Sequence, residues 1–461
     1  MANSSIKRVV SSASNRRTWT WSAWIKRCKV NAGDEQILFL GRDGSFPEKL
    51  KFTNDKLEYD HDIAGTDYTV YTGDRVYRDV NGYYHIVIAK DTTQATETNR
   101  IKIWVNGEQQ TLTEYQLGFP PQNYEGAINK NVTHWIGADG SSEFFDGLMS
   151  HVHFTDGTAY QASDFGSTDS VTGEWQINTS PNVNYGTNGF FIFKNGADRN
   201  GSNFTDRSGQ GNDWVGGDNY PAIDYYQNPS NIIATMNPLA NLKSNVGMLY
   251  GNTQITCTTN KGGATSTLAI PNNKGKIYVE DFLYTYATDN RFHFGIMPQE
   301  FQAADDPVAA ANKMIGFSGY NGAIYANGGN VNAFYGQNLS NNIEAKLGMA
   351  VDLTSATKTI AFSVNGAWIT GTNATSTDFA NALKVDITSY LSISSHWHVA
   401  IGNGNSSGVA GIHRVNFGSG KWGRDDFSGT TYNPSVGDTG AIFQYPVPTG
   451  YTALSTKGLN L

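Results

Sequence analysis

Residues 84–107 read YHIVIAKDTTQATETNRIKIWVNG, and this stretch predicts the hairpin that decides the fold class. Residues 101–105 within it alternate apolar side chains with lysine or tryptophan, which is the two-residue period of a strand with one apolar face. Asn106 and Gly107 then predict a tight turn, because both residues tolerate positive φ angles. Residues 347–366, LGMAVDLTSATKTIAFSVNG, repeat this plan and end in the same Asn-Gly pair. We therefore expect two β-sandwich domains, each with one such hairpin at its centre.

The composition of the whole chain favours short strands joined by many turns. Its 461 residues include 50 glycines and 24 tyrosines but 7 methionines, and no window has the apolar period of a long helix. The best helical candidate, residues 307–314, is short and starts with a proline. We expect an all-β fold of two antiparallel β-sandwich (jelly-roll) domains in tandem. A proline-containing, loop-like region predicts a first domain at residues 1–215, a linker at 216–236 and a second domain at 237–461.

Charge and cysteine content narrow the class of protein. The formal net charge is −8 with acidic and basic residues interspersed, so the chain lacks the basic stripe of a nucleic-acid-binding protein. No stretch has the length of a membrane span, and residues 1–17 lack the apolar core of a secretory signal. Cys28 and Cys257 lie far apart and predict two free thiols, which fits assembly in a cytoplasm. We expect no nucleic-acid partner and no membrane insertion.

Two tryptophans, Trp24 and Trp104, are the candidate ligand-binding residues. In residues 18–27, TWTWSAWIKR, Trp24 lies on the face opposite the apolar row that contains Trp19 and Trp21, and Trp104 has the same position in its own strand. An aromatic ring exposed on a sheet can stack on the apolar face of a sugar, which makes these two residues weak candidates for binding glycan. The alternative is that loops or a neighbouring subunit cover that face. The high aromatic content favours the alternative.

Metal-ligating side chains occur in several short clusters. The clusters are His151/His153, His396/His398, Asp60/Asp62, Asp305/Asp306 and Asp425/Asp426. Histidines at i and i+2 share one face of a strand, but no third ligand follows at a usual spacing, so we interpret them as ordinary strand residues. An acidic pair supplies too few of the roughly six to eight oxygens that Ca²⁺ takes. The metal ligands, if the protein has any, stay unknown.

The sequence lacks the carboxylate motif expected of an enzyme on this type of fold. Retaining glycosidases need two carboxylates about 5 Å apart, and jelly-roll members carry them as Glu-x-Asp-x-Glu on one strand. This chain has no such run, and the adjacent Glu280 and Asp281 would point to opposite faces of a strand. The zinc-protease run His-Glu-x-x-His is also missing. We expect a protein that is not an enzyme.

Segments along almost the whole chain carry a family resemblance. In the first half they are SSASNRRTWTWSAWIKR (11–27), the hairpin 84–107, FFDGLMSHVHFTDGTAYQASDFG (144–166), YGTNGFFIFK (185–194) and DRSGQGNDW (206–214). Together these segments resemble the laminin G-like (concanavalin A-type) domain of virion structural proteins of marine tailed phages. The second half resembles the SPRY-like domain that follows it in those proteins, through residues 237–239 (NPL), 348–366 and the ending 448–461 (PTGYTALSTKGLNL). The tryptophans usual in the first strand of that domain are replaced in residues 276–280, KIYVE, which removes any ligand site resting on them.

The resemblance implies a virion surface protein, made in the host cytoplasm and located on the exterior of the particle. Its favoured function is binding a host-surface glycan or receptor, as a tail fibre or adhesin. The alternatives are a capsid decoration or head-fibre protein without a ligand and, last, a polysaccharide depolymerase. Implied partners are other virion proteins and further copies of the chain, with a trimer favoured. Laminin G-like folds often bind Ca²⁺ at a rim, so calcium is the one cofactor suggested. Attachment is expected through domain faces or the basic segment Ile6–Arg17.

Overall fold

The structure of the chain, a computed structural model, falls into two compact units divided between residues 223 and 231. Nearly all of its elements are strands, which confirms the expected all-β class and the antiparallel sheets. The residues that the structure describes are 4–30, 33, 35–194, 199–200, 202–217, 221, 228–241, 246–257, 262–286, 292–301, 313–319, 321–326, 329–334, 339, 344–403, 411–423 and 425–460.

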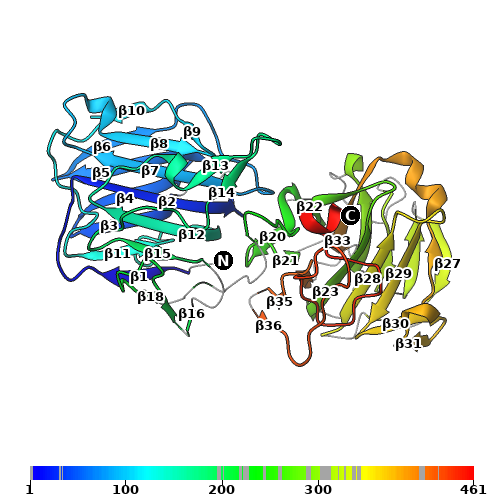
Figure 1. The fold of residues 1–461 in the computed structure, drawn as a ribbon. Coiled ribbons are helices and arrows are strands. Elements are labelled where there is room, and N and C mark those ends of the chain that lie inside the picture. Colours follow the sequence, from blue (N-terminus) through cyan, green and yellow to red (C-terminus); the bar gives the residue numbers. More distant parts are fainter. Residues whose placement is uncertain are drawn as a thin grey trace. The chain divides into compact units, whose positions relative to one another are not determined.

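The first unit has two main sheets (Figure 1), each named after one of its strands. The β4 sheet contains, in spatial order, β10 (Thr113–Gln116), β6 (Thr66–Tyr71), β5 (Lys56–Ile63), β4 (Phe46–Thr53), β3 (Gln36–Asp43), β11 (Thr133–Ile136), β1 (Ile6–Val9), β18 (Trp214–Gly216), β17 (Asn203–Phe204) and β16 (Arg199–Asn200). The β7 sheet contains β15 (Phe190–Ile192), β12 (Gly147–Asp156), β2 (Thr18–Arg27), β7 (Tyr84–Asp91), β8 (Ile101–Val105) and β9 (Glu108–Gln109). Smaller elements are the hairpin of β13 (Gly166–Thr168) and β14 (Trp175–Ile177) and the 3₁₀ turns Glu97–Asn99 and Ala162–Asp164.

The core of the first unit lies between its two sheets. Trp19 and Trp21 of β2 are fully buried, as their alternation predicts, and they pack on rings of the β4 sheet. The ring centroids of Trp19 and Tyr59 are 6.5 Å apart, and those of Trp21 and Phe39 are 6.4 Å apart. Aromatic pairs of this kind add to the stabilisation from burial alone. The apolar faces predicted for these strands therefore do meet as a sandwich.

The basic segment at residues 6–17, one of the two expected sites of attachment, begins as a strand of the first unit. Its first four residues form β1, which pairs with β11 on one side and β18 on the other. The Arg8 guanidinium donates to the carbonyl of Asn188 over 3.0 Å. Strand pairing on both sides satisfies the backbone of β1, so this part of the segment belongs to the β4 sheet.

The second unit also has two main sheets. The β33 sheet contains β19 (Met236–Asn241), β22 (Gly262–Pro271), β33 (His396–Asn403), β24 (Phe292–Pro298), β25 (Ile315–Ser318), β26 (Ala323–Ala326) and β27 (Gly329–Phe334). The β23 sheet contains β20 (Val246–Leu249), β21 (Gln254–Cys257), β34 (Gly411–Asn416), β23 (Lys276–Tyr286), β28 (Lys346–Asp352), β29 (Thr359–Val364), β30 (Ala367–Gly371) and β31 (Ala374–Ser376), with β32 (Val385–Asp386) paired to β29. Smaller elements are β35 (Lys421–Trp422), β36 (Asp425–Asp426), the 3₁₀ turns Gln299–Phe301, Phe379–Asn381 and Thr388–Ile393, and the helix α1 (Thr456–Leu459).

The two predicted hairpins are confirmed as β7–β8 and β28–β29. Each ends in an Asn-Gly turn with positive φ at both residues, 50° and 82° at residues 106–107 and 49° and 81° at residues 365–366. The aspartate that ends the first strand of each hairpin folds the following loop: Asp91 accepts from the backbone of Thr93, and Asp352 accepts from the backbone of Thr354. The shared pattern therefore reflects the same turn chemistry in both units.

Two sequence predictions fall outside the described residues. These are Asp305/Asp306 and all but the last two residues of the helical candidate at 307–314. In the part of the chain that the structure describes, no helix is long and apolar enough to cross a membrane.

Candidate functional site

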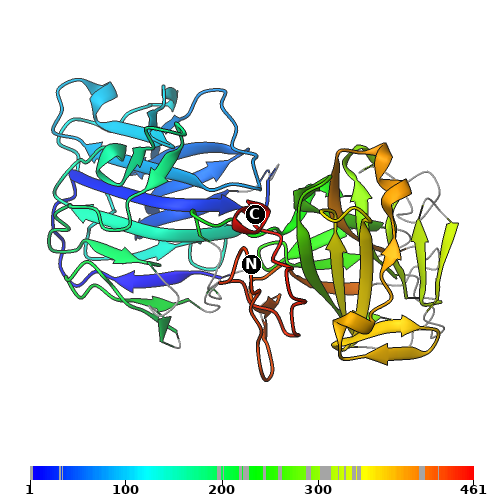
Figure 2. The ribbon, with the colours of Figure 1, turned by 45° about the vertical axis from the view of Figure 1, so that its right-hand side comes forward.

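The outer face of the β7 sheet, which carries both tryptophans singled out in the sequence, is closed. Trp24 and Trp104 are 6% and 7% exposed. The segment 158–185, which includes β13 and β14, crosses this face in both views (Figure 1 and Figure 2). Trp104 packs in one apolar cluster with Phe165 and Trp175 of that segment. Loop cover of this face was the favoured alternative, and it is what the structure has.

Trp175 fixes the covering segment to the sheet. Its indole Nε1 donates to Nδ1 of His85 over 2.9 Å, and the His85 ring stacks on Trp24 with centroids 4.8 Å apart. Burial lowers the pKa of His85 to about 3, so the ring is neutral and can accept this bond. A Cβ on Gly107 would lie 2.4 Å from the Trp175 ring, so the turn glycine makes room for it. The idea of an exposed sugar-stacking surface at Trp24 and Trp104 is therefore wrong.

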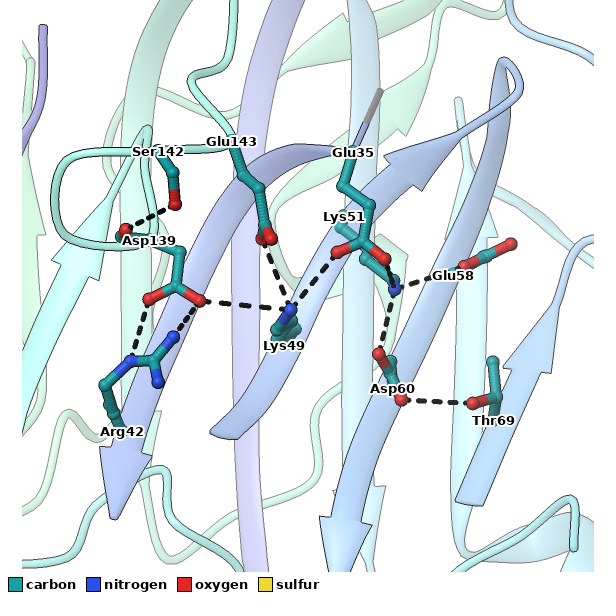
Figure 3. Close-up of polar contacts among 10 residues, drawn as sticks. All are labelled: Glu35, Arg42, Lys49, Lys51, Glu58, Asp60, Thr69, Asp139, Ser142 and Glu143. Carbon is teal, nitrogen blue, oxygen red and sulfur yellow. Dashed lines mark hydrogen bonds and ion pairs between the residues drawn. The ribbon is translucent and has the colours of Figure 1, made fainter. Parts of the chain in front are cut away.

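The outer face of the β4 sheet carries a continuous row of polar and charged side chains (Figure 3). The charged row consists of Glu35, Arg42, Lys49, Lys51, Glu58, Asp60, Thr69, Asp139, Ser142 and Glu143. Strand register explains why these side chains share a face, because Lys49 and Lys51 of β4 lie opposite Asp60 and Glu58 of β5. The residues between them, such as Leu50, point into the core. The charged row contains five carboxylates and three cationic side chains.

Lys49 is the centre of the charged row. Its Nζ lies 3.1 Å from Glu35 Oε2, 3.2 Å from Glu143 Oε2 and 3.9 Å from Asp139 Oδ2. The Lys49 side chain is only 12% exposed. Burial works against its charge, but the carboxylates of Glu35 and Glu143 outweigh burial and raise the pKa of Lys49. One ammonium thus holds three carboxylates in fixed positions at the surface.

Lys51 continues the charged row toward β5 and β6. Its Nζ lies 2.6 Å from Glu35 Oε1 and 2.8 Å from Asp60 Oδ2, and Thr69 Oγ1 donates to the other Asp60 oxygen over 3.0 Å. Burial opposes the charge on Lys51, but Asp60 and Glu35 outweigh it and raise its pKa. Burial likewise raises the pKa of Glu35, yet its bonds to the two lysines lower that pKa overall. Glu35 therefore stays ionised and bridges both lysines.

The other end of the charged row is built by the loop after β11. Arg42 binds Asp139 with two bonds, of which the one from Nε to Oδ1 is 2.8 Å long. Ser142 Oγ donates to the Asp139 carbonyl over 3.1 Å and closes the loop. Glu143 has φ of 52°, a left-handed conformation that is costly for a residue other than glycine. Burial and the neighbouring Glu35 raise the pKa of Glu143, although Lys49 opposes this. This conformation lets the loop bring the Glu143 carboxylate next to Lys49.

Aromatic rings border the charged row on both sides. Trp135 of β11 lies on the same face, since it pairs with Leu40, which in turn pairs with Lys49. Tyr71 of β6 lies on that face because it pairs with Glu58. Both rings are partly exposed, and each carries a lysine over its plane: Lys7 Nζ is 5.2 Å from the Trp135 centroid, and Lys56 Nζ is 4.7 Å from that of Tyr71.

This arrangement offers fixed hydrogen-bond acceptors and donors next to flat apolar rings. Sugar hydroxyls bond to carboxylates, and the C–H face of a sugar ring packs on tryptophan or tyrosine. The side chains are held by ion pairs before any ligand arrives, so little conformational entropy is lost on binding. The outer face of the β4 sheet is therefore suited to bind a glycan.

In three of the clusters named from sequence, a described residue has another partner. Among the described residues, no group of three or more His, Cys, Asp or Glu side chains is placed to hold a metal ion. His153 Nδ1 bonds the Tyr185 hydroxyl over 2.9 Å, and Asp60 belongs to the charged row. His398 Nδ1 bonds the carbonyl of Ser266 over 2.7 Å.

The outer face of the β23 sheet in the second unit is closed by the C-terminal segment. Phe443 of this segment packs on Tyr278 with ring centroids 5.0 Å apart, and Tyr451 belongs to the same apolar cluster. Glu280, fully buried beside Tyr278, accepts from the backbone N–H groups of Gln444 and Tyr445 over 2.9 and 2.8 Å. Burial raises the pKa of Glu280 to about 7, although these bonds and one from Asn416 work against the rise. Glu280 therefore holds the covering segment in place and is not available to a ligand.

Comparison with known families agrees with this description of the first unit. The family model described as "Concanavalin A-like lectin/glucanases superfamily", of the laminin G type, matches residues 3–164. Residues 3–164 of the first unit are thus similar to a laminin G-like domain of the concanavalin A-like type. The match covers every strand that contributes to the charged row.

Two solved structures are similar to this chain at low sequence identity. The native heptameric SAP-like pentraxin from Limulus polyphemus is 14% identical with a TM-score of 0.25, over 34% of this chain and 72% of the pentraxin chain. Domains LG4-5 of the mouse laminin alpha1 chain are 8% identical with a TM-score of 0.28, over 89% of this chain and 86% of the laminin chain. No curated protein matches the sequence.

Sequence reasoning missed the charged row, although part of its signal was present. In residues 49–60, lysines and then acidic residues alternate with apolar ones on either side of Asn54-Asp55. That pattern predicts a hairpin with opposite charges facing each other. Asp139 and Glu143 belong to a loop that is distant in sequence, and no sequence pattern predicts that they join the charged row.

Proposed function

We propose that this protein binds glycans without catalysis, through the charged row and the adjacent rings of Trp135 and Tyr71. The observation that carries the proposal is the contrast between the two outer faces of the first unit. The face with Trp24 and Trp104 is sealed, whereas the opposite face presents ion-paired, partly exposed side chains. A lectin-type domain with one open, pre-organised face supports ligand binding there.

The charge of the row indicates the class of glycan. Its carboxylates outnumber its cationic groups by two, and each of the three cations is already bound by a carboxylate. An anionic polysaccharide would meet net repulsion from the charged row itself, since Lys7 and Lys56 lie outside the row, over the bordering rings. We therefore propose a neutral or amino-sugar-containing polysaccharide as the ligand.

We further propose that the protein is a phage surface protein of the tail-fibre or adhesin type, with a SPRY-like second domain. The sequence resemblance in both halves of the chain supports this. The protein would then be made in the host cytoplasm and assemble on the virion exterior with other virion proteins and with copies of itself, as a trimer by preference. There it would bind host-surface polysaccharide.

Calcium stays a proposed cofactor. Binding measured with and without a chelator tests it, and unchanged affinity would remove calcium from the proposal.

A polysaccharide array tests the function directly. The full-length protein is applied to neutral, amino-sugar, uronic-acid and sulfated polysaccharides, and release of new reducing ends is measured in parallel. We expect signal on neutral or amino-sugar glycans and no release of reducing ends. Signal confined to sulfated or uronic glycans would contradict the ligand class, and release of reducing ends would show a depolymerase. If no glycan binds, a decoration or head-fibre role without a ligand becomes the better account.

Immunogold labelling of particles tests the proposed location on the virion exterior, and an interior position would contradict it.

A further inference from the structure

A lysine and a glutamate lie fully buried in the core of the first unit. Lys90 of β7 and Glu48 of β4 are both 0% exposed, and Lys90 Nζ lies 2.6 Å from Glu48 Oε1. The alternation in β7 puts Lys90 on the same face as Ile86 and Ile88, which belong to the core. The pair therefore joins the two sheets of the sandwich from within.

The groups around this pair hold the carboxylate in a defined orientation. Tyr59 donates its hydroxyl to Glu48 Oε1 over 2.8 Å, and the backbone N–H of Ile128 donates to Glu48 Oε2 over 2.7 Å. The rings of Trp19 and Tyr59 have centroids 5.8 and 5.9 Å from Lys90 Nζ. A Cβ on Gly126 would lie 2.0 Å from Glu48 Oε2 and 2.5 Å from Lys90 Nζ, so a glycine permits this close packing.

A charged pair in such surroundings is costly. Each ion loses its hydration on burial, a cost of several kcal/mol that the attraction between the ions and their hydrogen bonds must offset. Burial lowers the pKa of Lys90, which raises the fraction of nucleophilic free amine. Burial alone would raise the pKa of Glu48, but Lys90 and the Ile128 N–H outweigh it and lower that pKa, so the proton transfer to Glu48 is the uphill part of the reaction. A neutral amide at the same place would keep an oxygen for the Ile128 N–H and remove both buried charges.

We propose that Lys90 and Glu48 condense to an intramolecular isopeptide bond that cross-links the β4 sheet to the β7 sheet. One proton first passes from the ammonium to the carboxylate, which leaves a neutral amine and a carboxylic acid. Nζ then attacks Glu48 Cδ, and negative charge develops on Oε2, where the Ile128 N–H stabilises it. Oε1 takes a second proton from the nitrogen, assisted by the Tyr59 hydroxyl, and departs as water. The C–N bond forms, the C–O bond breaks, and ammonium plus carboxylate become amide plus water with no other reactant.

Two other ion pairs of the first unit each lack one of the required features. Lys51 Nζ is also 2.6 Å from a carboxylate oxygen of Glu35, but that glutamate is 30% exposed. Water therefore solvates its charge and removes the gain from condensation. Arg27 and Asp55 are both fully buried, but a guanidinium that stays protonated is not a nucleophile. Lys51 thus shows whether closeness to a carboxylate is enough for cross-linking, and Arg27 shows whether burial of an ion pair is enough.

Mass spectrometry of the denatured full-length protein tests the cross-link. We expect an intact mass lower by one water than the sequence requires, with the loss growing as freshly folded protein ages. Trypsin cannot cleave after an acylated lysine, so the digest should contain residues 43–49 joined to residues 79–100, uncut at Lys90. The peptide ending at Lys51 should be released unmodified.

The variant Lys90→Met tests whether the loss of water involves Lys90. Its intact mass should equal the mass calculated from its own sequence, whether or not it folds as stably as the parent protein. An unmodified mass for aged, folded parent protein, with free cleavage after Lys90, would overturn the proposal. A loss of water that persists in Lys90→Met, or that maps to peptides without Glu48, would overturn it too.

Discussion

The stability of the second unit should depend on pH through Glu280, and the replacement Glu280→Gln isolates the effect. Burial raises the pKa of this carboxyl from 4.5 to about 7 in the folded protein. A raised folded-state pKa means that the neutral acid is favoured by folding, so the stabilisation is complete below pH 4.5 and is lost as the pH rises through 7. The difference corresponds to about 3 kcal/mol in the free energy of unfolding.

The assay compares the two proteins by calorimetric unfolding across that pH range. Other carboxyls act in the opposite direction: hydrogen bonds outweigh the effect of burial and lower the pKa of Asp91 and of Asp352, so stability from these groups is lost as the pH falls. These groups are present in both proteins and cancel in the difference. We expect the stability of Glu280→Gln relative to the parent to rise by about 3 kcal/mol from pH 4.5 to pH 7 and above, in the transition of the second unit. A difference that stays constant with pH would refute the reasoning, because it would mean that Glu280 titrates alike in the folded and unfolded chain.

Two further replacements test the interior of the first unit. Trp104→Ala removes a ring packed beneath the covering segment and should lower the free energy of unfolding, measured by urea denaturation, by about 3–5 kcal/mol. The folded variant should still bind glycan. A decrease in the free energy of unfolding of less than about 1 kcal/mol would mean that the face is open in solution. Asp55→Asn leaves the guanidinium of Arg27, which is 0% exposed, without its charged partner and should cost about 3–5 kcal/mol in the same assay. The asparagine tolerates the φ of 65° at this position, so backbone strain is not the cause of the loss, and an unchanged midpoint would contradict the buried pair.

The interior of the sandwich could be predicted from the sequence because it depends on local periodicity. The alternation in residues 18–27 predicts that Trp19 and Trp21 face the core, and the structure confirms it. The same alternation puts Lys90 on the core face, but it cannot name Glu48 as its partner. That pairing needs the relative position of two sheets, which comes from contacts far apart in sequence.

The candidate site was harder to predict because it depends on what covers each face. Periodicity correctly assigns Trp24 and Trp104 to the outer face of the β7 sheet. Whether that face is open depends on the packing of segment 158–185 against it. The sequence of this segment is irregular and has no apolar periodicity from which its position could be predicted. In the charged row, the loop residue Glu143 reaches Lys49 through a left-handed backbone conformation, and no sequence motif predicts that conformation.

The most direct test of the proposed binding face is the affinity of a polysaccharide, selected on the array, for the Lys49→Met variant. This replacement keeps the length of the aliphatic side chain and removes the ammonium that holds Glu35 and Glu143. The matched control is Lys102→Met, on the sealed face of the β7 sheet. By titration calorimetry on folded protein, we expect binding to weaken at least about tenfold for Lys49→Met, which corresponds to about 1.4 kcal/mol, and to stay unchanged for Lys102→Met. Equal affinity of the parent and Lys49→Met would contradict the claim that the charged row binds the ligand.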